Sequence, residues 1–344
     1  MKEVYKSYML EQLKKLISID SPTGYTDNVQ TYLMNELTSL GYQPKRLHKG
    51  GVTAELGGEG NGLMLFAHCD TLGAVIRSIT PEGRLLLSRI GGLNPNNVET
   101  ETVRVYTRSG GCYDGTIQVP NASTHVNSEV NNPRSFETNL EVVLDEFIKS
   151  DGDVRELGIR NGDFVAVNPA FTVTEKGYIK SRFLDDKASA SVLLAYAKYL
   201  KDENITPARR VVIGFTVYEE VGHGAACGIP EGITDVLAVD MGCVGEGLDC
   251  TEKMVSICAK DSGGPYNYAM TTDLVNAAMA DGIDYAVDVY NFYGSDVEVS
   301  LKAGYDVRHA LIGPGVYASH GYERTHIDGL VNTFNLVRAY ISNI

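Results

Sequence analysis

Apolar residues recur along the first forty residues with the spacing of amphipathic helices. Residues 3–18 place apolar side chains about one helical turn apart, and the stretch from Val29 to Leu40 repeats that spacing after a turn-forming segment. Thr26 or Asp27 can cap the second helix, because both side chains accept hydrogen bonds from free backbone N–H groups. The chain therefore begins with two predicted helices.

Three later stretches are short apolar runs that end abruptly in polar side chains. The runs are residues 63–67, 211–217 and 235–239. They lead into His68 and Asp70, into Glu219 and Glu220, and into Asp240. Continuous apolar runs of this length, rich in β-branched residues, are typical of buried strands in parallel sheets. Each strand is thus predicted to deliver ionisable groups to its carboxyl end.

The pattern between these strands is different from about residue 74 onward. Short alternating runs separated by Gly, Asn, Pro and Ser replace helical periodicity, which predicts many short strands in a small barrel or sandwich. Alternating buried strands and helices return after Asp185 and Asp186, where an apolar helix is predicted at 188–200. We therefore predict an α/β fold with a mixed, mainly parallel sheet flanked by helices. The expected organisation is a catalytic domain at 1–73 and 173–344, interrupted by an inserted β-domain at 74–172.

Composition narrows the choice of partners. The 344 residues carry a formal net charge of −14, which argues against nucleic acid or an anionic membrane as partner, since both require a basic face. Six cysteines without paired spacing indicate free thiols in a reducing compartment. The N-terminus lacks a signal-peptide pattern, and no apolar stretch approaches the roughly 20 residues of a membrane span. A cytoplasmic protein is expected.

The polar strand ends define a candidate metal centre. Ligands in open α/β sheets bind at the carboxyl ends of the strands, so these side chains should converge. A histidine with several carboxylates is a ligand set for zinc or a similar divalent metal, and two histidines with three carboxylates suit two metals that share a carboxylate. Taken singly, each residue also has a structural interpretation: a hydrogen-bonded histidine, an Asp pair capping a helix, or a solvated Glu pair.

Five ordered motifs strengthen the metal interpretation. They are His68-Cys-Asp70-Thr-Leu-Gly73, Arg182-Phe-Leu-Asp185-Asp186-Lys187, Thr216-Val-Tyr-Glu219-Glu220-Val-Gly222, Ala238-Val-Asp240 and His320-Gly-Tyr-Glu323. In this order, over almost the whole chain, they resemble the M42 family of metallo-aminopeptidases, the glutamyl-aminopeptidase-like and tetrahedral aminopeptidases. The resemblance includes the all-β insertion between the first and second motifs. It implies a zinc-peptidase-like fold in which the insertion is a β-barrel that mediates oligomerisation, in relatives often into a dodecamer.

The resemblance also implies roles for individual residues. Asp185 would bridge two divalent metals, with zinc expected and cobalt or manganese as alternatives. His68 and Asp240 would complete one site, and Glu220 and His320 the other. Glu219 would be the general base acting on a metal-bound water, and Asp70 would orient His68. The implied reaction is hydrolysis of N-terminal residues from peptides, with no residue assigned to substrate binding.

Several alternatives remain open at this point. A carboxypeptidase or deacylase of the same dinuclear type would use the same ligands, and a glycosidase could use Glu219 and Glu220 as its carboxylate pair. A non-catalytic scaffold is disfavoured by the intact ligand set. His326 competes with His320 as the last ligand. His223 is either a pocket residue or a surface residue, whereas His309 is interpreted as structural.

Overall fold

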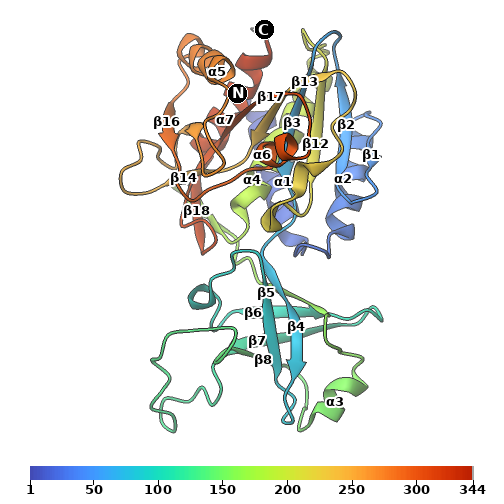
Figure 1. The fold of residues 1–344 in the computed structure, drawn as a ribbon, viewed down its shortest axis with the longest axis vertical. Coiled ribbons are helices and arrows are strands. Elements are labelled where there is room, and N and C mark those ends of the chain that lie inside the picture. Colours follow the sequence, from blue (N-terminus) through green and yellow to red (C-terminus); the bar gives the residue numbers. More distant parts are fainter. Residues whose placement is uncertain (343–344) are drawn as a thin grey trace. The chain divides into compact units, whose positions relative to one another are not determined.

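The computed structural model describes residues 1–342 (Figure 1). The chain divides into two compact units, one formed by residues 1–71 together with the chain from residue 170 onward, the other by residues 72–169. The first unit contains the large sheet and all the long helices, and the second is built from short strands. Each unit is described separately.

The first unit is organised around a twelve-stranded sheet with the order β1-β2-β12-β3-β13-β17-β18-β11-β10, and with β14, β15 and β16 joined to this path through β17 and β15. The strands are β1 (Lys45–Arg46), β2 (Val52–Gly57), β3 (Gly62–His68), β10 (Thr172–Val173), β11 (Tyr178–Ser181), β12 (Val211–Thr216), β13 (Ile233–Val239), β14 (Gly242–Val244), β15 (Val255–Lys260), β16 (Tyr285–Val289), β17 (Arg308–Tyr317) and β18 (Glu323–His326).

The centre of this sheet is parallel. Strands β12, β3, β13 and β17 run in the same direction, while β2, β15 and β18 pair with this group in antiparallel orientation. Every residue of β3 and of β12 is buried, as expected for strands covered on both faces. The carboxyl ends of the parallel strands consequently meet at one edge, and the predicted mixed, mainly parallel α/β fold is confirmed.

Helices cover both faces of the sheet. They are α1 (Glu3–Ser18), α2 (Asp27–Ser39), α4 (Leu184–Asp202), α5 (Tyr268–Asp281), α6 (Asp296–Lys302) and α7 (Ile327–Ser342), with short 3-10 turns η2 (Glu219–Val221) and η3 (Gly224–Ala226). α4 packs between α1 and α7, and α7 also contacts α5. α6, which lies in front of the sheet in Figure 1, places Val297 in one buried cluster with Met64 and Phe66 of β3. The sequence pattern did not predict α6.

The second unit is a closed six-stranded barrel with the order β4-β5-β8-β7-β6-β9. Its elements are β4 (Gly73–Ile79), β5 (Leu85–Ile90), η1 (Pro95–Asn97), β6 (Thr102–Tyr106), β7 (Cys112–Gln118), β8 (Glu141–Leu144), α3 (Asp151–Glu156) and β9 (Phe164–Val167). Alternate residues such as Val103 and Val105 are buried, which fills the interior. Of the two predicted folds, barrel and sandwich, the barrel is confirmed. The sequence pattern did not predict β8.

The segment Gly313–Gly315 lies inside a strand although it consists of glycine and proline. It is part of β17, where Pro314 pairs with Val255 of β15. A Cβ atom at Gly313 would lie 1.5 Å from the backbone oxygen of Asp240. The glycine therefore permits β17 to run beside the end of β13, and close backbone approach, not turn formation, explains its presence.

Asp235 of β13 anchors the edge of the sheet opposite the polar strand ends. Its carboxylate is fully buried and accepts two hydrogen bonds from Arg308, at 2.7 and 2.8 Å, while Arg209 Nη1 lies 2.7 Å away. Burial by itself raises the pKa of Asp235, but the hydrogen bonds from Arg308 and Arg209 lower it below its ordinary value. The interaction therefore ties β13 to β17 and to the chain just before β12.

Replacing Asp235 with alanine is expected to destabilise the protein by about 3–5 kcal/mol, because one half-exposed and one buried guanidinium lose their shared carboxylate. Because the folded-state pKa is lowered, the stabilisation is present above the unfolded-state pKa of about 4 and is lost as the pH falls below it. Urea unfolding of wild type and variant between pH 3 and pH 7 measures both effects. A difference that does not shrink at low pH would contradict this account.

Candidate active site

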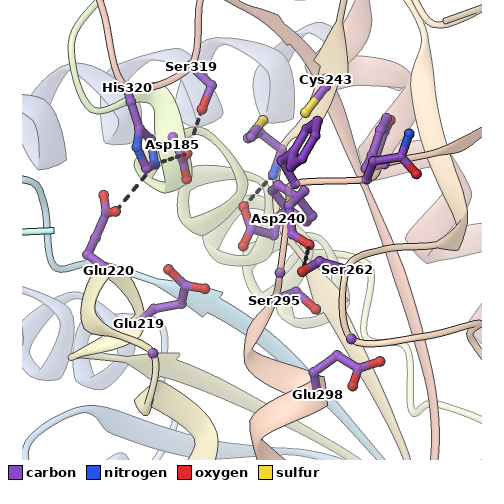
Figure 2. A pocket seen from close by; sticks show the side chains of 18 of the residues that line it. Asp185, Glu219, Glu220, Asp240, Cys243, Ser262, Ser295, Glu298, Ser319 and His320 are labelled. Carbon is purple, nitrogen blue, oxygen red and sulfur yellow. Dashed lines mark hydrogen bonds and ion pairs between the residues drawn. The ribbon is translucent and has the colours of Figure 1, made fainter. Parts of the chain in front are cut away.

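A cavity of about 790 Å³ opens at the carboxyl edge of the parallel strands (Figure 2). Its wall combines the start of α4, the turn η2, the segment after β13, and the chain leading into α6. The acidic residues Asp185, Glu219, Glu220 and Asp240 all line it, together with His320. Segments more than 130 residues apart in sequence thus contribute to one cavity, as the topology of the sheet requires.

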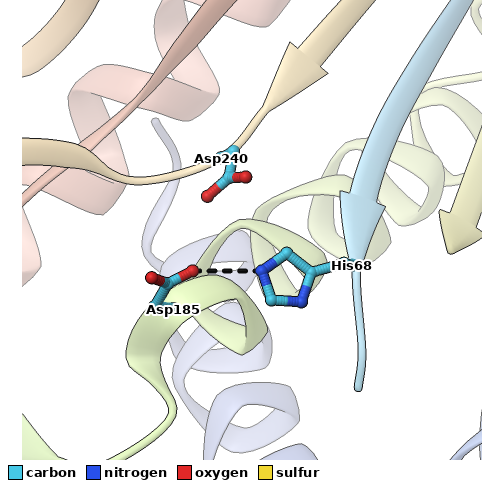
Figure 3. Close-up of side chains that lie close together, drawn as sticks. All are labelled: His68, Asp185 and Asp240. Atoms are coloured by element: carbon cyan, nitrogen blue, oxygen red, sulfur yellow. Dashed lines mark hydrogen bonds and ion pairs between the residues drawn. The ribbon is translucent and has the colours of Figure 1, made fainter. Parts of the chain in front are cut away.

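One cluster at the base of the cavity, which Asp185 and Asp240 line, has the composition of a metal site. His68, Asp185 and Asp240 are all buried, and one ligand atom of each lies within 4.8 Å of the others (Figure 3). His68 Nε2 lies 3.0 Å from Asp185 Oδ1. Imidazole and carboxylate groups bind zinc and similar ions at about 2.0–2.2 Å, so small side-chain rotations would let a single ion contact all three. The donor set therefore fits a divalent metal.

A second group of side chains shares Asp185. His320 Nε2 lies 3.7 Å from Asp185 Oδ2 and 3.5 Å from Glu220 Oε2. The two oxygens of Asp185 consequently face different neighbours, one towards His68 and one towards His320. Glu219 lies on the first side, with its Oε2 3.7 Å from His68 Nε2. The structure thus brings together all the metal-binding residues and the base expected from the sequence.

Asp70 connects His68 with Glu219. Its carboxylate is fully buried, with Oδ1 3.7 Å from His68 Nδ1 and accepting a 3.2 Å hydrogen bond from the backbone N–H of Glu219. Its other oxygen accepts a hydrogen bond of 2.6 Å from the hydroxyl of Thr23. The closest acceptor for His68 Nδ1 is the backbone oxygen of Asp70, at 3.0 Å. Both the main chain and the side chain of Asp70 therefore orient the histidine, and its carboxylate also positions the turn that carries Glu219.

Glu323 holds the backbone at Asp185 and at His320. This buried carboxylate accepts hydrogen bonds of 3.1 Å from the backbone N–H groups of Asp185 and of His320. Ser319 adds a side-chain hydrogen bond of 3.1 Å to Asp185 Oδ2. The sequence pattern assigned no role to Glu323 or Ser319. Glu323 could have been found from its position three residues after His320 in the last motif. Nothing in the sequence near Thr23 indicated that it would contact Asp70.

The backbone near the cavity adopts conformations that most residues avoid. Phe183, Tyr218, Ala318 and His320 all have φ values between 58° and 71°. Each precedes or carries a cavity residue, so left-handed backbone turns aim those side chains inwards. Such conformations cost about 1–3 kcal/mol each and are concentrated at functional sites.

The electrostatics of the cluster call for added positive charge. Burial raises the pKa of Glu219 and of Glu220 well above the ordinary value, and neighbouring carboxylates raise both further. Burial, followed by the charge of Asp185, raises the pKa of Asp240 to about 7. Burial lowers the pKa of His68, but its hydrogen bond to Asp185 and the charges of neighbouring carboxylates raise it well above the ordinary value. A bound cation would relieve this repulsion.

Two other histidines lie outside the cluster. His326 Nε2 is 2.8 Å from the backbone oxygen of Lys176, and its Nδ1 accepts a hydrogen bond from the N–H of Asp328 at 3.0 Å. Both ring nitrogens are thus engaged at the start of α7, and His320 is the histidine that faces Asp185. His223 is exposed and stacks on Tyr218 with ring centroids 5.2 Å apart. It is not among the residues that line the cavity.

Comparison with known proteins identifies the family. An α/β domain with polar side chains gathered at its strand ends, interrupted by a β-barrel, defines a class of peptidase fold. Residues 50–336 match the family model described as M42 glutamyl aminopeptidase. The chain therefore belongs to the M42 family of aminopeptidases, which are hydrolases acting on peptide bonds.

Individual relatives agree with this assignment. The chain is 41% identical over 336 residues to YhfE of Bacillus subtilis (strain 168), which is named as a candidate aminopeptidase, with 97% of each chain covered. It is 23% identical to the glutamyl aminopeptidase of Lactococcus lactis over 62% of this chain and 60% of that protein. The fold matches the TET1 peptidase of Pyrococcus horikoshii with a TM-score of 0.87, at 24% identity, covering 98% of this chain and all of that one.

Metal removal is expected to lower the stability of the protein, because the buried carboxylates lose their counter-charge. At a free metal concentration about 100 times Kd, binding should add about 2.7 kcal/mol to the free energy of unfolding. Thermal unfolding of chelator-treated protein with and without added Zn²⁺ measures the effect. Asp185→Asn should abolish most of the shift, and Asp306→Asn, which removes an exposed charge outside the cavity, should retain it. An equal shift in both variants would contradict a site centred on Asp185.

Proposed function

We propose that the protein is a dinuclear, metal-dependent aminopeptidase that removes N-terminal residues from peptides. The observation that carries the proposal is the position of Asp185 between two groups of ligand side chains, His68 and Asp240 on one side and Glu220 and His320 on the other. Each group has the imidazole and carboxylate donors that zinc, cobalt or manganese accept. When bound, such ions would polarise the scissile carbonyl and acidify a water molecule.

Glu219 is the proposed general base. Its side chain lines the cavity, is 15% exposed, and lies beside His68 without occupying either group of ligands. Burial raises its pKa, which suits a carboxylate that takes a proton from the attacking water and passes it to the leaving amine. Asp70 supports this step, because its hydrogen bond to the Glu219 backbone holds the turn in place.

The acidic edge of the cavity also suits recognition of the substrate's free N-terminus. A free α-amine can bind in the region of the second ligand group, Glu220 and His320, while the scissile carbonyl faces Glu219. A blocked N-terminus offers no such amine. Cleavage is therefore expected to be restricted to the first residue of a peptide.

Glu219→Gln is expected to retain bound metal and to lose at least about 10²-fold in kcat, because glutamine keeps the size of the side chain but cannot accept the proton. Elemental analysis and hydrolysis of an aminoacyl-4-nitroanilide measure the two properties on the same sample. Glu231→Gln, an exposed substitution outside the cavity, serves as the control. Turnover close to wild type by Glu219→Gln would remove Glu219 from the role of base.

A carboxypeptidase or deacylase of the same metal type is the alternative function. N-acetylation of the peptide substrate separates the two, since an aminopeptidase loses activity on the blocked substrate and a deacylase does not. A glycosidase that uses Glu219 and Glu220 would survive chelation, because its chemistry requires only two carboxylates. The packing of His68 and His320 against these carboxylates favours the metal-dependent reaction.

Assembly into a homo-oligomer is part of the proposal, with the barrel of residues 72–169 as the oligomerisation unit. The support is the fold similarity to the Pyrococcus horikoshii peptidase, which can assemble into a tetrahedron or a large octahedral shell. Light scattering coupled to size exclusion should therefore give a mass several times 37.4 kDa, with twelve copies as the expected number. A monomer at micromolar concentration would contradict this. The cytoplasmic location stays a prediction from the sequence; among residues 1–342, no helix meets the length and apolarity needed to cross a membrane.

A further inference from the structure

One buried carboxylate in the cavity wall has no part in the proposed chemistry. Glu298 of α6 lines the cavity, is only 8% exposed, and belongs to neither group of metal-binding side chains. In the view of Figure 2 it lies on the opposite side of the cavity from Glu220 and His320, with Asp240 between them. Glu298 therefore lines a part of the cavity that lies away from the two groups of metal-binding side chains. This part of the cavity, next to Glu298, is called the recess below.

Helix capping does not account for Glu298. Ser295 and Glu298 have the spacing of a capping box, in which the serine and the acid bond each other's backbone N–H groups. The Ser295 side chain makes no capping hydrogen bond and instead pairs with the hydroxyl of Tyr266, at 2.8 Å. Helix α3 shows the contrast, because Ser150 and Asp153 form the complete box there. Glu298 therefore does not form the capping box that its position in α6 suggests.

The surroundings hold the carboxylate in place and supply little positive charge. A Cβ atom at Gly263 would lie 2.5 Å from Glu298 Oε2, so the adjacent loop packs directly against the acid. His309 Nε2 lies 3.4 Å from Glu298 Oε1, within ion-pair distance when the imidazole is protonated, but it makes no hydrogen bond to the carboxylate. Lys302 also lines the cavity, yet it is exposed, and within residues 1–342 it forms no ion pair with Glu298.

The metals of the proposed sites would not offset the charge of Glu298. Under the proposed function, two divalent ions offset Asp185, Asp240 and Glu220. Glu298 lies outside that arrangement, and its low exposure weakens screening by water, so its field acts on whatever enters the recess. A cationic group would gain an ion pair there, an anionic group would be repelled, and an apolar group would leave the carboxylate unpaired.

We propose that Glu298 makes the enzyme select substrates whose N-terminal residue carries a cationic side chain, lysine or arginine. The inference rests on the proposed aminopeptidase function and specifies its substrate class. The names of the family and of the Lactococcus lactis relative both refer to glutamyl substrates. In this recess a glutamyl side chain would meet the like charge of Glu298, so a different preference is expected. His309, interpreted as structural from the sequence, then lies beside the specificity-determining acid.

A panel of aminoacyl-4-nitroanilides tests the wild-type protein directly. Lysine, arginine, norleucine and glutamate are the informative side chains, because norleucine matches the length of lysine without its charge. We expect kcat/KM for lysine to exceed that for norleucine by at least ~10-fold, with glutamate the poorest substrate. Equal rates for lysine and norleucine, or a preference for glutamate, overturn the proposal. Failure to cleave any member of the panel, with metal supplied, overturns the aminopeptidase function instead.

Glu298→Gln assigns the selectivity to this side chain. We expect the lysine-to-norleucine ratio of kcat/KM to fall by about 10-fold, to a value near one, mainly through KM for lysine, because a buried ion pair is lost. Glu298→Lys should shift the preference towards glutamate. Asp306→Asn removes one exposed negative charge near the end of α6 and controls for the overall charge of the protein. An unchanged ratio in Glu298→Gln, or an equal fall in Asp306→Asn, contradicts the assignment.

Direct binding separates selectivity from a folding defect. Thermal midpoints of the variants show whether α6 remains intact, and calorimetry compares the affinities of L-lysine and L-norleucine for the metal-loaded protein. Wild type should bind lysine more tightly, and Glu298→Gln should bind the two with similar affinity. A stable Glu298→Gln variant that still prefers lysine excludes Glu298 as the determinant.

Discussion

The burial of several like charges at one edge of a sheet is the constraint on which the rest of the structure depends. Asp185, Glu219, Glu220 and Asp240 converge within one cavity, and burial makes their mutual repulsion expensive. The fold tolerates this arrangement because parallel strands must end at the same edge and because surrounding groups supply hydrogen bonds. Under the proposed function, a bound divalent cation would offset this repulsion and would acidify a water molecule.

The supporting residues show how the fold holds that cluster. Asp70 contacts both His68 and the turn that carries Glu219, while Glu323 accepts hydrogen bonds from the backbone N–H groups of Asp185 and His320. Asp235 performs a comparable task at the opposite edge, where it binds Arg209 and Arg308. Carboxylates at these strand ends therefore have different partners: backbone N–H groups for Asp70 and Glu323, guanidinium groups for Asp235 and, under the proposed function, metals for Asp185 and Asp240.

The elements that the sequence predicted well are those whose information is local. Buried strands such as β3 and β12 read as continuous apolar runs, and α1 spans the predicted residues 3–18. The elements that it missed depend on distant partners. α6 is only seven residues long and is stabilised by packing Val297 against β3, and Gly313 lies in a strand because β17 must pass close to Asp240. Neither contact can be recognised from neighbouring residues alone.

The sequence by itself determined which side chains stand at the ends of buried strands, and hence that imidazoles and carboxylates would meet. The periodicity of apolar residues carries that information because burial acts on every strand position. Only the tertiary structure decided how these groups divide: that His320 and not His326 faces Asp185, that Thr23 bonds to Asp70, and that Glu298 lines the cavity instead of capping its helix. Such choices depend on distances of a few ångströms between segments far apart in the chain, which no local pattern encodes.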